Sequence, residues 1–238
     1  MLTPALEDVW ARYAAPRVVD AGSGNAYLGF ILYELFLKGS DKGELLSIEG
    51  REELTARARE RATRLGFSRM AFETATLEGA KYPERIHLLT ALHACDTATD
   101  DALAAAIAHN ADYVAVVPCC QAEVARQLKE GREKASAALE PLFAHPWHRR
   151  EFGSHLTNVL RALTLEACGY QVTVTELTGW EHSLKNELIL GRKVHRENRP
   201  ARAKLERLLG ETGVAPKLVR TLGLAPKGAE PAAPPPAE

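Results

Sequence analysis

Short apolar runs alternate with longer amphipathic segments along most of the chain. The short runs, rich in Val, Ile and Leu, predict strands near 17–20, 45–49, 68–74, 86–93 and 113–117. The amphipathic segments predict helices over 27–37, 51–66, 100–109, 123–142 and 155–168. Two extended runs joined by a short polar segment predict a hairpin over 171–177 and 186–194. We therefore expect an α/β fold, a Rossmann-like, doubly wound, seven-stranded and mostly parallel sheet with an antiparallel last strand.

The chain is long and apolar enough to form one well-packed domain. It has 238 residues, of which 46% are hydrophobic and 26% are charged. We expect one folded domain over 1–194, followed by a basic helical appendage over 195–225. The segment 226–238 is rich in Pro and Ala, cannot form a core, and is expected to be disordered. The net charge of -1 gives no overall attraction to nucleic acid, so any basic surface must be local.

Cysteine usage and the pattern of apolar segments favour the cytoplasm. The four cysteines do not form a disulfide framework, which is typical of a reduced compartment. The first residues carry acids and no continuous apolar block, which argues against a signal peptide. Because no apolar run is long enough to span a bilayer, we expect no membrane association.

A glycine-rich turn follows the first predicted strand, in the sequence DAGSGNAY that starts at Asp20. Gly22 and Gly24 let the backbone approach a ligand closely, and the following helix start points N–H groups at it. Glu49 ends the second predicted strand, at about the spacing where nucleotide-binding sheets place a carboxylate on ribose hydroxyls. The sequence therefore predicts a nucleoside cofactor.

Polar residues gather where the predicted strands end. They are Asp20, Glu49, the segment 93–96 and the segment 119–121. Ligands of open α/β sheets bind beyond the carboxyl ends of the strands. We therefore expect these residues to share one site.

The same segments resemble the class I S-adenosylmethionine-dependent methyltransferases. DAGSG is similar to their first motif, and Glu49 to the ribose-binding acid of their second. The segments LHACDTATDDAL (92–103), VPCCQ (117–121) and HSLKNELI (182–189) resemble one subgroup more closely. This subgroup is the methyltransferase domain of the glutathione S-transferase C-terminal-domain-containing protein and of related bacterial proteins, and it is distantly similar to tRNA 2'-O-methyltransferases. The resemblance covers about 15–194, so it implies a methyltransferase domain over 1–194.

S-adenosylmethionine is the cofactor that this resemblance implies. The residues that match the family's cofactor positions are Asp20, Gly22, Ser23, Gly24, Tyr27, Glu49, Thr76, Leu77, Leu92 and His93.

Four residues are candidates for the chemistry of methyl transfer. Cys119 or Cys120 is placed to act as a thiolate nucleophile, as in enzymes that methylate carbon 5 of pyrimidines, but paired cysteines more often pack under a cofactor. His93 and Asp96 are candidate bases, and a lone histidine is about as often structural. Asp100 is more typical of a helix N-cap, a role that Thr99 also fits.

A metal site is the rival interpretation of the cysteines and histidines. Cys95, Cys119 and Cys120, with His93 or with the pair His145 and His148, offer zinc ligands. No CxxC pair is present, and neighbouring cysteines point poorly at one ion. We therefore expect no metal.

Candidate substrate contacts come from two parts of the chain. They are Thr99, Gln121, Lys185, Asn186, Arg192 and Lys193. The run 192–207 holds seven Lys or Arg and two Glu, which indicates a phosphate-binding surface or a solvated helix face. Trp147 and Trp180 are the best candidates for stacking on bases.

The sequence thus predicts an S-adenosylmethionine-dependent methyltransferase that acts on RNA, either tRNA or rRNA. Methylation of a protein or a small molecule is the second possibility, and a non-catalytic cofactor-binding module is the third. Neither the methylated atom nor the oligomeric state follows from the sequence.

Overall fold

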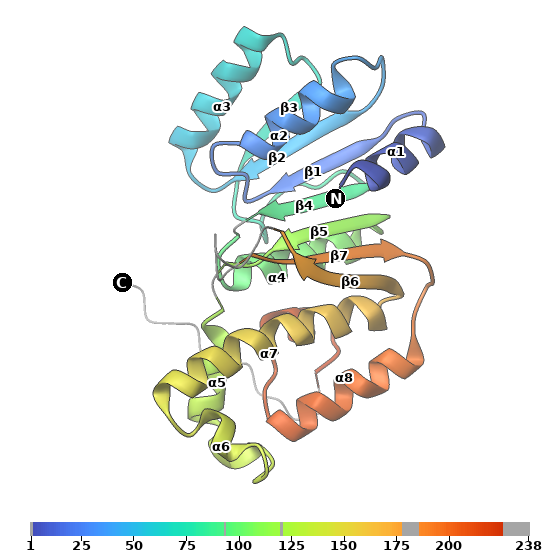
Figure 1. Ribbon diagram of the computed structural model, residues 1–238. Helices are drawn as coiled ribbons and strands as arrows, with labels where there is room; N and C mark the ends of the chain where they lie inside the picture. Colours follow the sequence, from blue (N-terminus) through green and yellow to red (C-terminus); the bar gives the residue numbers. More distant parts are fainter. Residues whose placement is uncertain (1, 93, 120, 178–185, 226–238) are drawn as a thin grey trace.

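A seven-stranded sheet runs through the computed structural model, which describes residues 2–92, 94–119, 121–177 and 186–225 (Figure 1). The strand order is β3-β2-β1-β4-β5-β7-β6. Strand β7 pairs antiparallel with both β5 and β6, whereas the pairs among β1 to β5 are parallel. The strands are β1 (Arg17–Ala21), β2 (Glu44–Glu49), β3 (Met70–Thr74), β4 (Leu88–Leu92), β5 (Tyr113–Val117), β6 (Tyr170–Glu176) and β7 (Glu187–Lys193). The predicted doubly wound sheet with a reversed last strand is confirmed.

Helices connect the strands and extend the fold after β5. They are α1 (Thr3–Arg12), α2 (Tyr27–Leu32), the π-helical turn η1 (Tyr33–Leu37), α3 (Glu52–Leu65), α4 (Thr97–Ala108), α5 (Glu123–Glu130), the 3₁₀ turn η2 (Arg132–Lys134), α6 (Glu140–Phe143), α7 (Pro146–Ala167), α8 (Arg199–Thr212) and α9 (Lys217–Thr221). Within the described residues, no helix combines the length and the apolar composition that a bilayer crossing requires.

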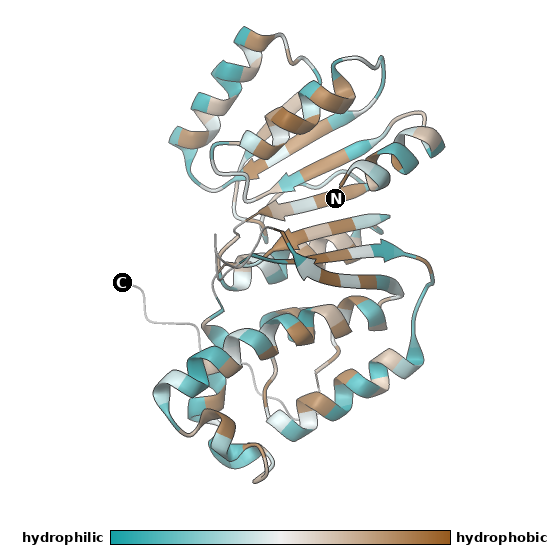
Figure 2. Ribbon diagram, viewed as in Figure 1, coloured by the Kyte–Doolittle hydropathy of each residue, from teal (hydrophilic) through white to brown (hydrophobic). Residues whose placement is uncertain are grey.

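The pleat of β1 divides the core between the two faces of the sheet. Val18 packs with Leu6 of α1 and with apolar residues of α2 and α3. Val19, on the opposite face, packs with Leu103 of α4 and with other residues of that helix. Successive strand residues point to opposite faces, so a run that is apolar at every position is buried on both sides. Figure 2 shows the resulting apolar strands between helices whose outer sides are largely hydrophilic.

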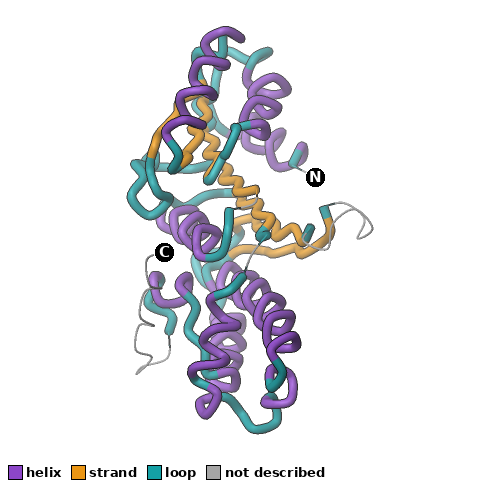
Figure 3. Tube along the Cα trace, turned by 90° about the vertical axis from the view of Figure 1, so that its left-hand side faces the viewer, coloured by secondary structure: helices purple, strands orange, loops and turns teal. Residues whose placement is uncertain are grey.

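A third group of helices packs beyond β6, where α5, α6, α7 and α8 lie together (Figure 3). Leu205 and Leu209 of α8 share a core with Leu156 and Leu160 of α7. Leu218 of α9 is buried against the α4 side of the sheet. The segment 195–225 contains α8 and α9 and is packed into the fold, whereas the predicted tail, 226–238, lies outside the described residues.

Two predicted helices have different bounds in the structure. The single helix expected over 123–142 is wrong, because α5 ends before Gly131 and α6 begins afresh with a proline at its start. Helix α7 begins at Pro146, well before the expected start, since proline is favoured in the first turn. The expected N-cap role of Asp100 or Thr99 is also wrong, because both lie inside α4.

Candidate functional site

The turn between β1 and α2 adopts left-handed backbone angles that favour glycine. Gly22 has a φ of +68° and Gly24 a φ of +55°. A side chain at either position would strain the backbone, whatever the space around it. The Ser23 amide donates to the Ile48 carbonyl over 2.9 Å, which ties the turn to the end of β2.

Glu49 joins this turn to the end of β2. Its Oε2 accepts from the Gly24 amide over 2.9 Å, and its Oε1 accepts from Nε of Arg51 over 2.8 Å and from the Arg51 amide over 3.1 Å. Burial alone would raise the pKa of Glu49, but the hydrogen bonds from Arg51 and Gly24 outweigh it and hold the pKa below its usual value. The glycine turn therefore faces an ionised carboxylate, as the sequence predicts for a nucleoside site.

Asp20 is a buried carboxylate beneath the turn. Its Oδ1 accepts from the Thr90 hydroxyl over 3.1 Å. Its Oδ2 is buried without a hydrogen-bond partner of normal geometry in the described part of the chain. Burial raises the pKa of Asp20 to about 6, against smaller opposing contributions from Thr90 and the backbone of Gly29. A cationic donor that reached Oδ2 would favour the ionised form.

Apolar residues from two other strand ends lie beside Gly22. A Cβ at Gly22 would lie 3.5 Å from Cβ of Ala94 and 4.0 Å from Cδ1 of Leu77. Leu92 ends β4 just before this point. The structure thus brings the segments after β1, β3 and β4 together.

Two predicted cofactor contacts have other neighbours in the structure. Thr76 accepts from the Gly79 amide over 3.3 Å, within the turn after β3. Tyr27 starts α2 with an exposed ring, and the guanidinium of Arg61 lies 5.6 Å from its centroid.

Asp96 connects the segment after β4 to the start of α5. Its Oδ1 accepts from the amides of Ala122 over 2.9 Å and Glu123 over 3.3 Å. This carboxylate therefore caps α5 across space, a role that stabilises helix N-termini. Asp96 has a φ of +46°, which a non-glycine residue rarely adopts and which marks a strained turn.

A buried ion pair between Arg161 of α7 and Asp100 of α4 lies next to the turn that contains Asp96. Arg161 and Asp100 have side chains that are each 2% exposed, and Nε and Nη2 of Arg161 donate to the two carboxylate oxygens over 2.9 and 3.1 Å. Nη2 also donates to the Asp96 carbonyl over 2.8 Å, and Nη1 donates to Oδ1 of Asn158 over 3.2 Å. Burial raises the pKa of Asp100, and the charge of Arg161 opposes the shift.

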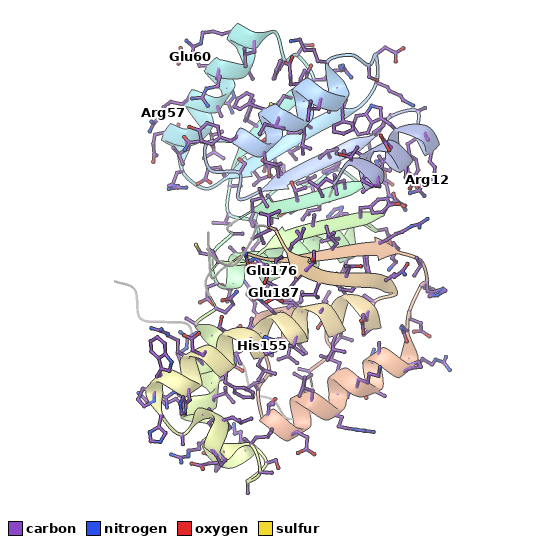
Figure 4. All side chains as sticks on the ribbon, in the orientation of Figure 1. Arg12, Arg57, Glu60, His155, Glu176 and Glu187 are labelled. Carbon is purple, nitrogen blue, oxygen red and sulfur yellow. The ribbon has the colours of Figure 1, made fainter. Side chains whose placement is uncertain are left out.

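Gln121 belongs to a polar chain that extends this network. Its Oε1 accepts from the Ser154 hydroxyl over 2.6 Å, and its Nε2 donates to Asn158 over 3.3 Å. Asn158 donates to Glu187 over 3.0 Å. Glu187 starts β7 directly across from Glu176 of β6, and Figure 4 shows both acids above His155 of α7. Because Ile189 pairs with Val116, the start of β7 lies at the carboxyl end of β5.

The sequence interpretation missed the polar face of α7. Ser154, Asn158 and Arg161 are spaced four and three residues apart, so they share one side of the helix. Polar residues at that spacing on the buried side of an otherwise apolar pattern are the signal that could have identified them.

Three predicted substrate contacts do not face this site. Thr99 is buried, and its hydroxyl donates to the Ala94 carbonyl over 2.6 Å. Arg192 pairs in register with Tyr113, at the amino end of β5, because β7 runs in reverse. Lys193 donates to the Cys168 carbonyl over 2.6 Å and lies 4.8 Å from the Tyr170 ring centroid. A substrate contact by the buried Thr99 side chain is therefore wrong, whereas for Arg192 and Lys193, which lie near the other end of β7, contact with a substrate stays a prediction.

The remaining predicted residues are placed only in part. His93, Cys120, Lys185 and Trp180 lie outside the described residues. The carbonyl of Asn186, just before β7, accepts from the Leu177 amide over 2.8 Å. Among the described side chains, no three His, Cys, Asp or Glu groups are arranged to hold a metal ion.

Known proteins are similar to this chain in sequence or in fold. A family model described as a methyltransferase domain matches residues 1–127, which is more than half of the chain. The glutathione S-transferase C-terminal domain-containing protein of Homo sapiens is 29% identical over 194 residues, covering 74% of this chain and 30% of that protein. The Xenopus laevis protein of the same name is 28% identical over 193 residues, covering 73% and 30%. The chain thus spans about 30% of the length of these curated relatives.

An rRNA methylase from Streptococcus thermophilus has a similar fold, with a TM-score of 0.52 and 13% identity, over 81% of this chain and 93% of that one. At this identity the likeness shows the fold alone. The family match, the strand order and the acid-flanked glycine turn agree with one another. The chain therefore belongs to the family of methyltransferase domains, and its fold is that of the class I S-adenosylmethionine-dependent methyltransferases.

Proposed function

We propose that this chain transfers a methyl group from S-adenosylmethionine to RNA. The proposed binding of S-adenosylmethionine rests on the hydrogen bond from the Gly24 amide to Glu49, which places an ionised carboxylate against the glycine turn. The choice of RNA as the substrate is supported by a basic surface outside this site.

The residues of the turn fit the three parts of the methyl donor. Glu49 offers an acceptor to ribose hydroxyls, and the Arg51 side chain that shares it is 63% exposed and can swing aside. Oδ2 of Asp20, buried without a normal partner in the described chain, suits the ammonium of the methionine part. Leu77 offers an apolar contact to the adenine. When bound, the sulfonium supplies an electrophilic methyl group.

The acceptor side is formed by the segments after β4 and β5. Methyl transfer needs the nucleophile, methyl and sulfur in line, and such orientation contributes about 7–11 kcal/mol to barrier lowering. Two contacts fix the segment after β4. Asp96 caps the start of α5, and Arg161 donates to the Asp96 carbonyl. A nucleophilic role for Cys119 or Cys120 stays a prediction, and full activity of both Cys119→Ala and Cys120→Ala would end it.

A basic pocket supports RNA as the substrate. It has a volume of about 280 Å³ and is lined by Lys193, Arg196, Arg199 and Arg202, among other residues. The pocket lies at the end of β7 that is away from the glycine turn, and a seven-residue strand is about 23 Å long. A small substrate cannot bridge that distance, whereas an RNA backbone can contact both places.

Labelled methyl donor and RNA from cells lacking the gene test the proposal. We expect label in RNA that is sensitive to ribonuclease and resistant to protease, and nucleoside mass spectrometry then identifies the methylated atom. Label in protein alone, or in neither fraction, would contradict the RNA proposal.

Charge reversal tests the basic pocket separately. The double variant Arg196→Glu/Arg199→Glu removes two cations, so the salt dependence of RNA binding should fall by about 1.4 in log–log slope. The matched control is Arg57→Glu/Arg64→Glu on exposed positions of α3, which should leave the slope unchanged. Equal slopes in wild type and the first variant would exclude this surface.

A further inference from the structure

Two thiols from neighbouring strands meet at the carboxyl edge of the sheet. The sulfur atoms of Cys95 and Cys119 are 3.2 Å apart. Cys95 lies three residues beyond Leu92 of β4, and Cys119 two residues beyond Val117 of β5, and these strand ends pair in register. The strand ends thus place the two residues on neighbouring segments, and from a separation of 3.2 Å a small movement of the sulfur atoms reaches the S–S bond length of about 2.05 Å.

We infer that Cys95 and Cys119 form a modification site at which a peroxide oxidises the two thiols to an intramolecular disulfide. One thiolate attacks the peroxide oxygen, forming a sulfenic acid and releasing hydroxide. The second thiol attacks that sulfur, forming the S–S bond and releasing water. Two thiols lose two electrons and two protons, and hydrogen peroxide is reduced to two molecules of water.

Exposure makes Cys95 the first residue to react. Cys95 is exposed, and Cys119 is only partly buried. The pKa of the Arg51 guanidinium is raised, chiefly by its hydrogen bond to Glu49 and in smaller part by Cys95, so this cation lies within electrostatic range of the sulfur. The redox pair therefore lies beside the ribose-binding acid of the proposed donor site.

The other described cysteine serves as an internal control. Cys168 follows α7, and its carbonyl accepts from Lys193 at the opposite edge of the sheet. Burial raises the pKa of the Cys168 thiol, which lowers its reactivity. We expect Cys168 to stay reduced under conditions that oxidise the pair.

A disulfide would reinforce an existing contact between the segments that follow β4 and β5. Asp96 follows Cys95 directly, and its carboxylate binds the amides of Ala122 and Glu123 close after Cys119. The bond would close a loop between residues 24 positions apart. Such a loop should raise the thermal midpoint by roughly 5–10 °C relative to the reduced protein, and dithiothreitol should reverse the shift.

Mass spectrometry after oxidation tests the site without a methyl donor or an RNA. The purified protein is treated with one equivalent of hydrogen peroxide, alkylated and digested without reduction. We expect one peptide pair joined through Cys95 and Cys119, with Cys168 alkylated. The pair should be absent from Cys95→Ser and Cys119→Ser and retained in Cys168→Ser.

Three results would overturn the inference. They are sulfinic acid at Cys95 without a linked peptide, a link between two molecules, and a link that persists in Cys119→Ser but is lost in Cys120→Ser. Fragmentation of the linked wild-type peptide also assigns the bond to Cys119 or Cys120, so the test does not depend on how well the variants fold. It also does not depend on the proposed methyl transfer, which the labelling experiment addresses.

Discussion

Replacing Arg161 by methionine should destabilise the fold more than any exposed charge change. The guanidinium is buried and satisfies three groups at once: the Asp100 carboxylate, the Asp96 carbonyl and the Asn158 side chain. Methionine has similar volume and removes all of these donors. The Asp100 carboxylate then stays buried without its cation.

The magnitude follows from the burial of both partners. Removing one member of a buried ion pair costs about 3–5 kcal/mol, because the remaining charge is left uncompensated. For a chain of this size that corresponds to a thermal midpoint lowered by about 6–20 °C. In the variant the pKa of Asp100 rises further above its ordinary value of 3.8. The folded state then holds a proton that the unfolded state releases, so the free energy of unfolding falls as the pH rises through the folded-state pKa.

Urea denaturation at pH 5 and pH 8 measures both effects. We expect the deficit of Arg161→Met to be larger at pH 8, and Asp100→Asn in the same chain to recover part of it. The matched control is Arg202→Met, whose side chain is 49% exposed in an i,i+4 pair with Glu206 and should change stability by about 0.5 kcal/mol or less. A deficit of Arg161→Met no larger than that of the control, or one that is independent of pH, would refute the reasoning.

Three further changes test the turn and the packing beyond it. Glu49→Gln removes a charged acceptor and should weaken binding of S-adenosylhomocysteine in calorimetry by about 10- to 100-fold, and undiminished affinity would contradict the assigned ribose contact. With a pKa raised from 3.8 to about 6, Asp20 should lower the wild-type free energy of unfolding by about 2.4 kcal/mol between pH 4 and pH 8, and Asp20→Asn should lack this dependence in urea titrations. Gly153→Ala would place a Cβ 2.8 Å from the Ala125 backbone and should cost about 1–3 kcal/mol, whereas Gly210→Ala, with no atom within 4 Å, should stabilise by about 0.5–1 kcal/mol in the same assay.

The sheet could be predicted from sequence because its signals are local. The central parallel strands β1, β4 and β5 are short runs that are largely apolar on both faces, Gly22 and Gly24 follow β1, and Glu49 ends β2. The helices beyond β5 were harder to predict. The amphipathic periodicity continues across Gly131 and Pro141, although the helix is interrupted between α5 and α6. The periodicity of apolar residues indicates which face of a helix is buried, whereas the point at which a helix ends can depend on a single glycine or proline.

The contact between Glu49 and the glycine turn was predictable, and the contacts of Arg161 were not. Glu49 and Gly24 come from adjacent strand ends, so strand order alone brings them together. Arg161 of α7 meets Asp100 of α4 across 61 positions and after the irregular connection between α5 and α7, which no local pattern specifies. The position of Arg192 follows from the direction of β7. The predicted hairpin already implied that β7 runs in reverse, and therefore that its last residues lie at the opposite edge of the sheet.

The buried pair on α7 is better explained by positioning than by stability. A well-packed apolar pair at Arg161 and Asp100 would be about as stable, since desolvation offsets most of the attraction between buried charges. An apolar side chain, however, cannot donate to the Asp96 carbonyl, and Asp96 adopts a left-handed conformation that needs support from its surroundings. The clamp on the carbonyl, the cap on α5 and the thiol contact all act on the segment that carries Cys95 and Asp96. That segment lies beside the glycine turn and belongs to the proposed acceptor side, so holding it in one conformation would fix the distance across which a methyl group moves.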